Sequence, residues 1–152
     1  MKIRTLLPPE HIFLKAGLED KQAVLRFIAD SFGGLGVVRN TDNVHKALKT
    51  REEMMSTGIG NGIGIPHALT PEAEDIAVLL ISLAHPIPFD SLDGAPVDIV
   101  IALIVPQNET TLHLRTLAGI SGLCKRPGFL EMVRQSRDSR LLWENIRNTE
   151  DG

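Results

Sequence analysis

The stretch Val97-Asp-Ile-Val-Ile-Ala-Leu-Ile-Val105 is a continuous apolar run rich in β-branched residues, and Pro106 ends it. A second run of this kind, Ile76-Ala-Val-Leu-Leu-Ile-Ser-Leu83, precedes it. Apolar runs of this length without polar alternation are typical of strands that are covered on both faces. We therefore expect two buried strands. The segment Ile87–Pro96 between them is predicted to be a loop with a turn at Asp93-Gly94.

Segments with a helical spacing of apolar residues precede and follow these two runs. The first is expected to begin at an N-cap, Asp20, and to stop at Gly33-Gly34. A second helix is predicted from the residue after Thr41 to about Met54, and a third from Asn108 or Glu109 to the break at Pro127-Gly128. Two short helices are predicted at about 129–135 and 141–146, the last with Asp138 as its cap. A short strand is predicted at residues 11–16, either a turn or the start of a very short helix at 70–72, and a frayed polar end at 148–152.

Strand and helix patterns therefore alternate along the chain. This alternation predicts an α/β fold with a central sheet covered by helices on both faces. We find no internal repeat, low-complexity tract or interdomain linker in the 152 residues. A chain of this length can bury a substantial core as one unit, so we expect a single domain over residues 1–152.

The composition excludes several classes of function. A net charge of −3 gives no global electrostatic reason to bind nucleic acid or an anionic membrane. The only cysteine, Cys124, stands in an apolar helical context, so neither a disulfide framework nor a cysteine zinc cluster is expected. No apolar run approaches the roughly 20 residues of a membrane-spanning helix. We expect a cytoplasmic protein that is neither secreted nor anchored.

The most unusual segment is Ser56-Thr-Gly-Ile-Gly-Asn-Gly-Ile-Gly-Ile-Pro-His67. Its glycines recur at every second position, so an extended segment would have one face without side chains that another segment could approach closely. Ile63 and Ile65 are expected to anchor the other face. Pro66 favours an extended or turn conformation before it and would present His67 at the end of the segment.

Three familiar uses of such a segment can be excluded. A dinucleotide site needs G-x-G-x-x-G between a strand and a helix, whereas the glycines here alternate strictly and Pro66-His67 follows them. A P-loop needs Lys and Ser or Thr directly after its last glycine, and both are absent. The five histidines are scattered without an H-x-x-x-H pair, so no metal is expected. The sequence also indicates no cofactor.

From the residues alone, His67 has two open interpretations. It is either a nucleophile that accepts a phosphoryl group, or a residue that merely ends a strand in a tight turn. His113 lies beside the apolar face of its predicted helix, where the default is a hydrogen-bonded, partly buried side chain. Arg51 and Arg115 could bind phosphate, although a lone helical arginine is usually a solvated charge. Glu52 and its neighbour Glu53 have the pattern of surface charges.

Four segments together resemble a known family. They are Thr50-Arg51-Glu52-Glu53, the glycine-rich segment through Ala68, Pro96 to Pro106, and His113-Leu-Arg-Thr-Leu117. In this order they closely resemble the IIA domains of the bacterial phosphoenolpyruvate-dependent sugar phosphotransferase system, in the fructose/mannitol class and nearest to its nitrogen-regulatory members. The resemblance covers almost the whole chain. Nitrogen-type members commonly have a further histidine two positions after the second one, where this chain has Arg115.

The resemblance implies a mixed sheet between helices and assigns roles to three residues. His67 would be the phosphorylated histidine, His113 the second active-site histidine, and Arg51 the arginine that precedes the motif. The phosphate would come from the phosphocarrier HPr or its nitrogen-branch counterpart NPr. We add to these roles that Arg51 would stabilise charge. Further phosphate contacts are expected from Thr57 and from the backbone amides of the segment that holds Gly58, Gly60 and Gly62.

The resemblance leaves three functions open. The first is a regulatory phosphocarrier of the nitrogen branch, whose phosphorylation state would control binding to a target protein. The second is a transport component that passes the phosphoryl group to a sugar-specific IIB protein. The third is a binding module that keeps the fold without phosphate chemistry.

Overall fold

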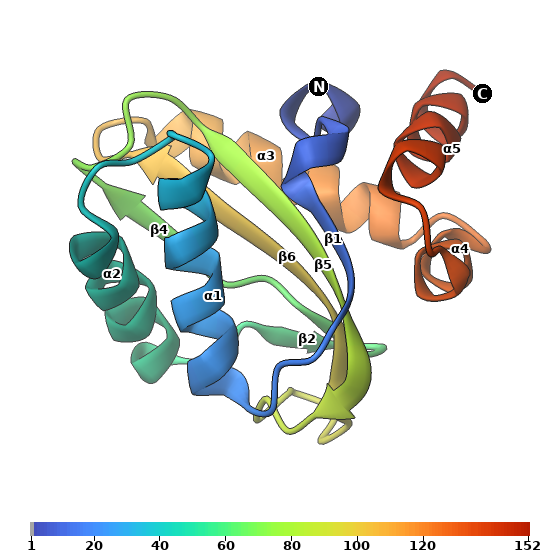
Figure 1. Cartoon of the computed structure of the whole chain (residues 1–152), viewed down its shortest axis with the longest axis horizontal. Coiled ribbons are helices and arrows are strands. Elements are labelled where there is room, and N and C mark those ends of the chain that lie inside the picture. Colours follow the sequence, from blue (N-terminus) through green and yellow to red (C-terminus); the bar gives the residue numbers. More distant parts are fainter. Residues whose placement is uncertain (1) are drawn as a thin grey trace.

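In the computed structural model, which describes residues 2–152, strand β6 (Val97–Pro106) lies inside a six-stranded sheet (Figure 1). It pairs on one side with the antiparallel strand β5 (Ala77–Ile87). On the other side it pairs with two short parallel strands in succession, β3 (Ile63–Gly64) and β4 (His67–Thr70). The edges are β1 (Ile12–Ala16), parallel to β5, and β2 (Gly58–Gly60), antiparallel to β3. The sheet is therefore mixed.

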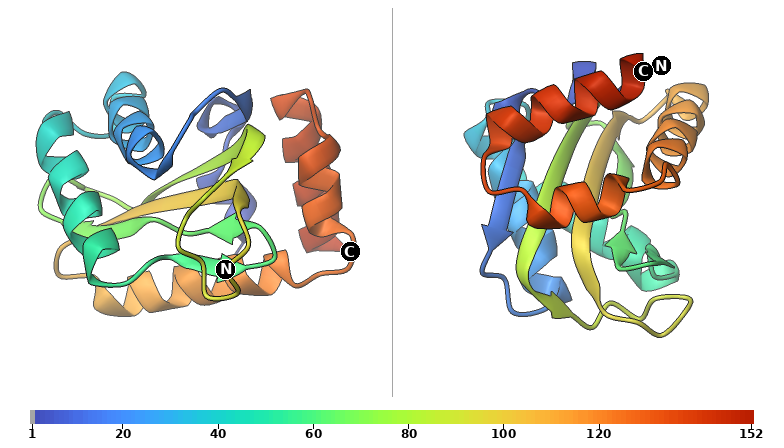
Figure 2. Two further views of the ribbon diagram at one scale, coloured as in Figure 1. Left: turned by 90° about the horizontal axis from the view of Figure 1, so that it is seen from below. Right: turned by 90° about the vertical axis from the view of Figure 1, so that its right-hand side faces the viewer.

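Helices cover both faces of this sheet, as the sequence predicts (Figures 1 and 2). One face carries α1 (Lys21–Gly34) and α2 (Thr41–Met54), and the other carries α3 (Thr110–Cys124), α4 (Phe129–Gln135) and α5 (Ser139–Asp151). Successive residues of a strand point to opposite faces. Leu79 and Ile81 accordingly pack on the side of α1 and α2, whereas Val78 and Leu80 pack against the other three helices. Two apolar layers explain why β5 lacks polar alternation.

Local capping explains where several helices begin. The side chains of Asp20 and Asp138 accept hydrogen bonds from backbone N–H groups in the first turns of α1 and α5, which confirms both predicted caps. The cap of α2 is Asn40, so this helix begins at Thr41, one residue earlier than predicted. Such a bond satisfies one of the N–H groups that have no partner inside the helix.

The glycine-rich segment differs from its prediction. It is not one extended strand but a hairpin, because Asn61 and Gly62 between β2 and β3 both have positive φ, 58° and 81°. Positive φ at two successive turn residues is the conformation that reverses a tight hairpin, and Asn-Gly suits it well. The expected close approach is confirmed: a Cβ atom at Gly64 would lie 3.0 Å from the ring of Phe89. Ile63 and Ile65 are buried as predicted.

Other boundaries were also predicted wrongly. Strand β4 was missed, since its four residues are too few to reveal a period, and β5 extends to Ile87 through an irregularity after Ser82. The residues before β1, for which no element was predicted, form two short 3-10 helices, Ile3–Leu6 and Pro9–His11. Helix α5 continues to Asp151 instead of fraying at 148. Its last turn is held because the Glu150 carboxylate accepts the N–H groups of Ile3 and Arg4, at 2.7 and 2.9 Å.

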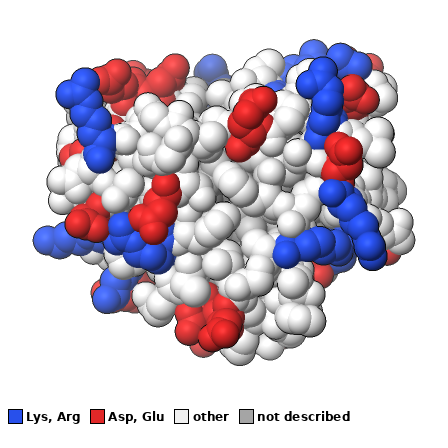
Figure 3. Space-filling model, viewed as in Figure 1, with Lys and Arg blue, Asp and Glu red and all other residues white. Residues whose placement is uncertain are grey.

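The surface carries charges of both signs. On the face shown in Figure 3, Lys and Arg side chains lie beside Asp and Glu side chains, and neither sign forms an extended area of its own. Within residues 2–152, no helix is both long and apolar enough to cross a membrane.

Candidate active site

His67 is the first residue of β4, directly after Pro66. Its backbone lies opposite Leu103 in the parallel pairing with β6, and the Leu103 N–H donates to the Pro66 carbonyl at 3.0 Å. The imidazole Nδ1 lies 2.6 Å from the carbonyl oxygen of Ile65. A carbonyl oxygen can only accept, so Nδ1 must carry the proton and Nε2 of the neutral ring keeps its lone pair. The backbone thus selects the tautomer.

His113, from the first turns of α3, faces this ring from the other side of the site. The two ring centroids lie 5.1 Å apart, with their planes inclined by 45°. His113 is buried, with 9% of its surface exposed, and its Nδ1 has no hydrogen-bond partner among residues 2–152. The default expectation of a hydrogen-bonded histidine is therefore wrong at this ring nitrogen.

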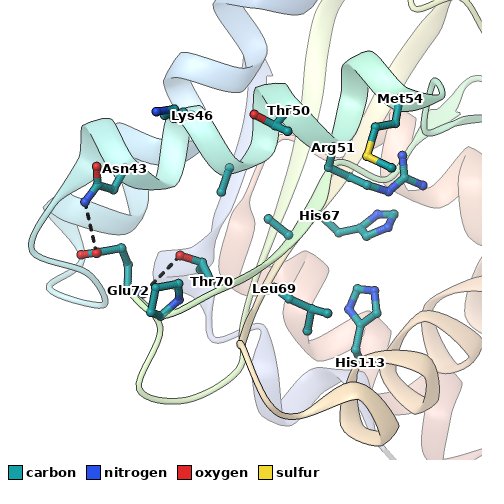
Figure 4. A pocket seen from close by; sticks show the side chains of 13 residues that line it. Asn43, Lys46, Thr50, Arg51, Met54, His67, Leu69, Thr70, Glu72 and His113 are labelled. Carbon is teal, nitrogen blue, oxygen red and sulfur yellow. Dashed lines mark hydrogen bonds between the residues drawn. The ribbon is translucent and has the colours of Figure 1, made fainter.

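Arg51 completes the cluster from the last turn of α2. One Nη atom donates to the carbonyl of Met55 at 2.9 Å, and the guanidinium extends over His67 (Figure 4). Arg51, His67 and His113 line one end of an open groove of about 570 Å³ between α2, β4 and α3. The structure thus brings together three side chains that lie far apart in the sequence.

The pKa values of both histidines are lowered in this site. Burial is the main cause that lowers the pKa of His67 below its ordinary value of 6.5, and Arg51 lowers it further. The hydrogen bond to Ile65 and the charge of Glu52 act in the opposite direction. The pKa of His113 is also lowered, first by burial and then by His67 and Arg51. Both rings are therefore neutral at neutral pH.

Comparison with known proteins identifies the family. Residues 5–149 match the family described as "Phosphoenolpyruvate-dependent sugar phosphotransferase system, EIIA 2". The chain belongs to this EIIA type 2 family. Its members are phosphocarriers of the phosphotransferase system, and this EIIA protein is therefore a component of that system.

Relatives of this EIIA protein include nitrogen regulatory proteins and a fructose-specific EIIA component. A nitrogen regulatory protein of Bradyrhizobium diazoefficiens is 34% identical over 143 residues, which cover 94% of this chain and 93% of the relative. A fructose-specific EIIA component of Haloferax volcanii is 34% identical over 119 residues, covering 78% and 77% of the two chains.

Solved structures share the fold of this EIIA protein. The crystal structure of the nitrogen regulatory protein IIA-Ntr from Neisseria meningitidis superposes with a TM-score of 0.88 at 26% identity, covering 95% of this chain and 98% of that one. The mannitol enzyme IIA of Escherichia coli, solved in complex with phosphorylated mannitol enzyme IIB, has a TM-score of 0.75 at 21% identity, with coverage of 92% and 99%. Family members thus include one that pairs with a IIB protein.

The predicted phosphate contacts in the hairpin of this EIIA protein do not reach the groove. Thr57 is buried, and both its N–H and its hydroxyl donate to Glu52, at 3.0 and 2.6 Å. The hydrogen-bond register places Ile63 opposite Ile99 and His67 opposite Leu103. At about 3.3 Å per residue, the hairpin turn is roughly 13 Å or more from His67.

The glycine positions agree with this placement. Gly58 approaches Ser91, Gly60 lies beside Asp93, and Gly62 lies beside Asp98 and Arg134. None of the three lines the groove with His67. We therefore keep His67, His113 and Arg51 in the candidate site and leave out the hairpin residues.

Glu52 was predicted wrongly to be a surface charge. Only 6% of its surface is exposed, and its carboxylate lies 2.7 Å from Nζ of Lys21. A signal was present in the sequence, since Val44, Leu48 and Glu52 follow one another at i, i+4 and i+8 on the buried face of α2. Glu53, the next residue, is exposed as expected. Within the described residues 2–152, no three His, Cys, Asp or Glu side chains gather as a metal site would need.

Proposed function

We propose that His67 accepts a phosphoryl group on Nε2 and later passes it on or holds it as a regulatory mark. The observation that supports this proposal best is the hydrogen bond from Nδ1 to the Ile65 carbonyl, because it leaves the Nε2 lone pair free. A lowered pKa keeps this nitrogen unprotonated at neutral pH. The half-buried ring is also restricted in orientation, which favours an in-line approach.

The transfer step follows from this tautomer. The Nε2 lone pair attacks the phosphorus atom of a phosphohistidine on the donor protein, and a new N–P bond forms. The donor's N–P bond breaks, and its electron pair returns to the donor's ring nitrogen. The proton on Nδ1 of His67 stays in place, so the ring carries a positive charge that the Ile65 carbonyl stabilises.

Arg51 and His113 supply the charge stabilisation that phosphoryl transfer depends on. The guanidinium of Arg51 extends over His67 and can donate to the phosphoryl oxygens. A buried N–H group without a hydrogen-bond partner costs more free energy than a buried ring nitrogen whose lone pair accepts no hydrogen bond. The unpartnered Nδ1 of His113 is therefore the unprotonated one, and its Nε2–H is the donor for a phosphoryl oxygen.

The donor would be HPr or its nitrogen-branch counterpart NPr, and the main role would be regulatory. The nitrogen regulatory relatives support this role. The alternative is onward transfer to a fructose- or mannitol-class IIB protein, which is supported by the fructose-specific relative and by the mannitol IIA–IIB complex. A binding module without phosphate chemistry is disfavoured, because such a module does not require Arg51, His67 and His113 to converge.

One reconstitution tests the reaction. The protein is incubated with phosphoenolpyruvate, enzyme I and either HPr or NPr. We expect an acid-labile, base-stable phosphate on the wild type and none on His67→Ala. Undiminished labelling of His67→Ala, or no labelling of the wild type with either donor, would contradict the proposal. Rapid discharge to one sugar-specific IIB protein would then favour transport over regulation.

A further inference from the structure

Glu52 is a buried carboxylate in the last turns of α2, beside the arginine of the proposed site. It accepts two hydrogen bonds from Thr57, one from the backbone N–H at 3.0 Å and one from the hydroxyl at 2.6 Å. Both groups of Thr57 are thereby fixed at the point where the chain leaves the helix and enters the hairpin. A charged acceptor makes these bonds stronger than neutral ones.

The hydrogen bonds continue from Thr57 to His67. The carbonyl of Thr57 accepts from the N–H of Ile65 at 3.0 Å. The carbonyl of the same Ile65 accepts from Nδ1 of His67 at 2.6 Å. Thr57 is held through its N–H and its hydroxyl, and its carbonyl holds Ile65. The carbonyl of Ile65 in turn holds the ring of His67. The orientation of the His67 ring therefore depends on where Glu52 places Thr57.

Lys21 makes this arrangement possible. Its Nζ lies 2.7 Å from the Glu52 carboxylate, and the two side chains are only 15% and 3% exposed. A buried carboxylate is costly unless a paired charge and hydrogen bonds compensate it. The same ammonium lies 4.6 Å from the ring centroid of Phe89, and that ring packs against Gly64. Lys21 therefore supports both strands of the hairpin, through Glu52 on one side and Phe89 on the other.

We propose that Glu52, ion-paired with Lys21, is a positioning residue for the phosphoryl transfer. It holds Thr57, and through Thr57 it holds Ile65, so that the Ile65 carbonyl fixes Nδ1–H of His67. This inference rests on the proposed function of His67. Glu52 does not line the groove and touches no reacting atom. Glu52 acts on His67 in two ways. Its hydrogen bonds hold the backbone that orients the ring, and its negative charge acts on the ring electrostatically.

Glu52→Gln is the main variant, since it keeps the size of the side chain and removes the charge. Its matched control is Glu53→Gln, the same change at the next, exposed position. The first measurement records the nitrogen-15 resonances of the His67 ring against pH in the unphosphorylated protein. Arg51, Glu52 and His113 are the charged or titratable groups that act on this ring or face it. We expect Glu52→Gln to lower the His67 pKa and to raise the population of the Nε2–H tautomer.

The second measurement is the rate of phosphorylation of His67 by the phosphorylated donor. We expect Glu52→Gln to lower this rate about ten-fold, the smaller of the effects seen when residues that orient a metal-binding histidine are replaced. Glu53→Gln should leave the rate unchanged. A folded Glu52→Gln variant with the tautomer, pKa and rate of the Glu53→Gln control would overturn the proposal. If the wild type is not phosphorylated at all, the proposed function fails, but the resonance measurement still tests the positioning role.

Thr57→Val provides a second route if Glu52→Gln does not fold. It removes only the hydroxyl bond to Glu52 and keeps the backbone bond. We expect a slower phosphorylation and a weakened Nδ1–H preference in Thr57→Val, with recovery in Thr57→Ser. Wild-type behaviour of a folded Thr57→Val variant would count against the chain of bonds from Glu52 to His67.

Discussion

The rings of His67 and His113 face each other with their centroids 5.1 Å apart. His67 lies at the start of strand β4, and His113 lies in helix α3. The two rings differ in their bonding. Nδ1 of His67 is held by a backbone carbonyl, whereas Nδ1 of His113 has no partner within the described residues 2–152. One ring is thus suited to attack and the other to donate a hydrogen bond.

His113→Ala is expected to keep the fold and to slow the phosphorylation of His67. Loss of one donor to a transferring group typically costs on the order of 100-fold in rate, and we expect a reduction of that size. The measurement is the rate of transfer from the phosphorylated donor under single-turnover conditions, with circular dichroism as a check of folding. His85→Ala is the control, because His85 is exposed and does not line the groove. Normal transfer by His113→Ala would remove this residue from the site.

The stability of the protein should fall as the pH drops below the ordinary histidine pKa. Both His67 and His113 have lowered pKa values in the folded state, so the unfolded chain binds more protons below pH 6.5. The contribution of the neutral rings is fully present above 6.5 and is lost as the pH falls toward the lower pKa of the folded state. Thermal denaturation from about pH 7.5 to about 5.5 measures this loss.

A matched variant isolates the histidine contribution to this pH dependence. His113→Gln should show a shallower decrease than the wild type, since one of the two rings with a lowered pKa no longer titrates. His85→Gln, with its exposed position, should keep the wild-type slope. Equal slopes in all three proteins would show that His113 does not control the pH dependence of stability in this range.

Lys21→Met is expected to destabilise the protein by about 3 kcal/mol, because it leaves the Glu52 carboxylate buried without its paired charge. The side chain of Lys21 is 15% exposed and that of Glu52 is 3% exposed, so water can compensate only a little. Chemical denaturation at neutral pH measures the loss. Lys49→Met, at an exposed position of α2, should change stability by less than about 0.5 kcal/mol.

The double variant Lys21→Met/Glu52→Gln tests the same ion pair in another way. It should recover part of the stability lost in Lys21→Met, since no unpaired charge remains in the interior. If the double variant is as unstable as the sum of its two single variants, the pair does not act as a unit.

Gly62→Ala should destabilise the hairpin by roughly 1 to 3 kcal/mol. Its φ of 81° is disfavoured for residues with a Cβ atom, and that atom would lie 2.5 Å from a guanidinium nitrogen of Arg134 and 2.7 Å from an oxygen of Asp98. Arg134 and Asp98 form an ion pair at 2.9 Å, which the variant would disturb. Thermal denaturation measures the effect.

Gly34→Ala is the control for this change. Gly34 is the last residue of α1, and apart from its chain neighbours and the helix's own backbone no atom lies within 4 Å of the position its Cβ would take. We expect a neutral or slightly stabilising effect there, because alanine favours helix. A loss in Gly34→Ala equal to that in Gly62→Ala would mean that the turn geometry is not the cause.

The sequence determined the fold class of this EIIA protein and most of its elements. Continuous apolar runs identify β5 and β6, because strands buried on both faces need apolar residues at every position. Helical spacing and the caps Asp20 and Asp138 identify helices, because these signals act within a few residues. The glycine pattern and Pro66 single out His67, and the resemblance to the family indicates His113 and Arg51 as the other residues of the site.

Only the tertiary structure decided how these parts meet. Strand β4 has four residues and depends on pairing with β6, so no local pattern reveals it. The reversal at Asn61 and Gly62 carries the hairpin glycines away from the groove, whereas a regular strand was predicted. The burial of Glu52 depends on Lys21, a residue of another helix. A site assembled from segments far apart in the chain requires long-range packing, and local sequence signals do not determine such packing.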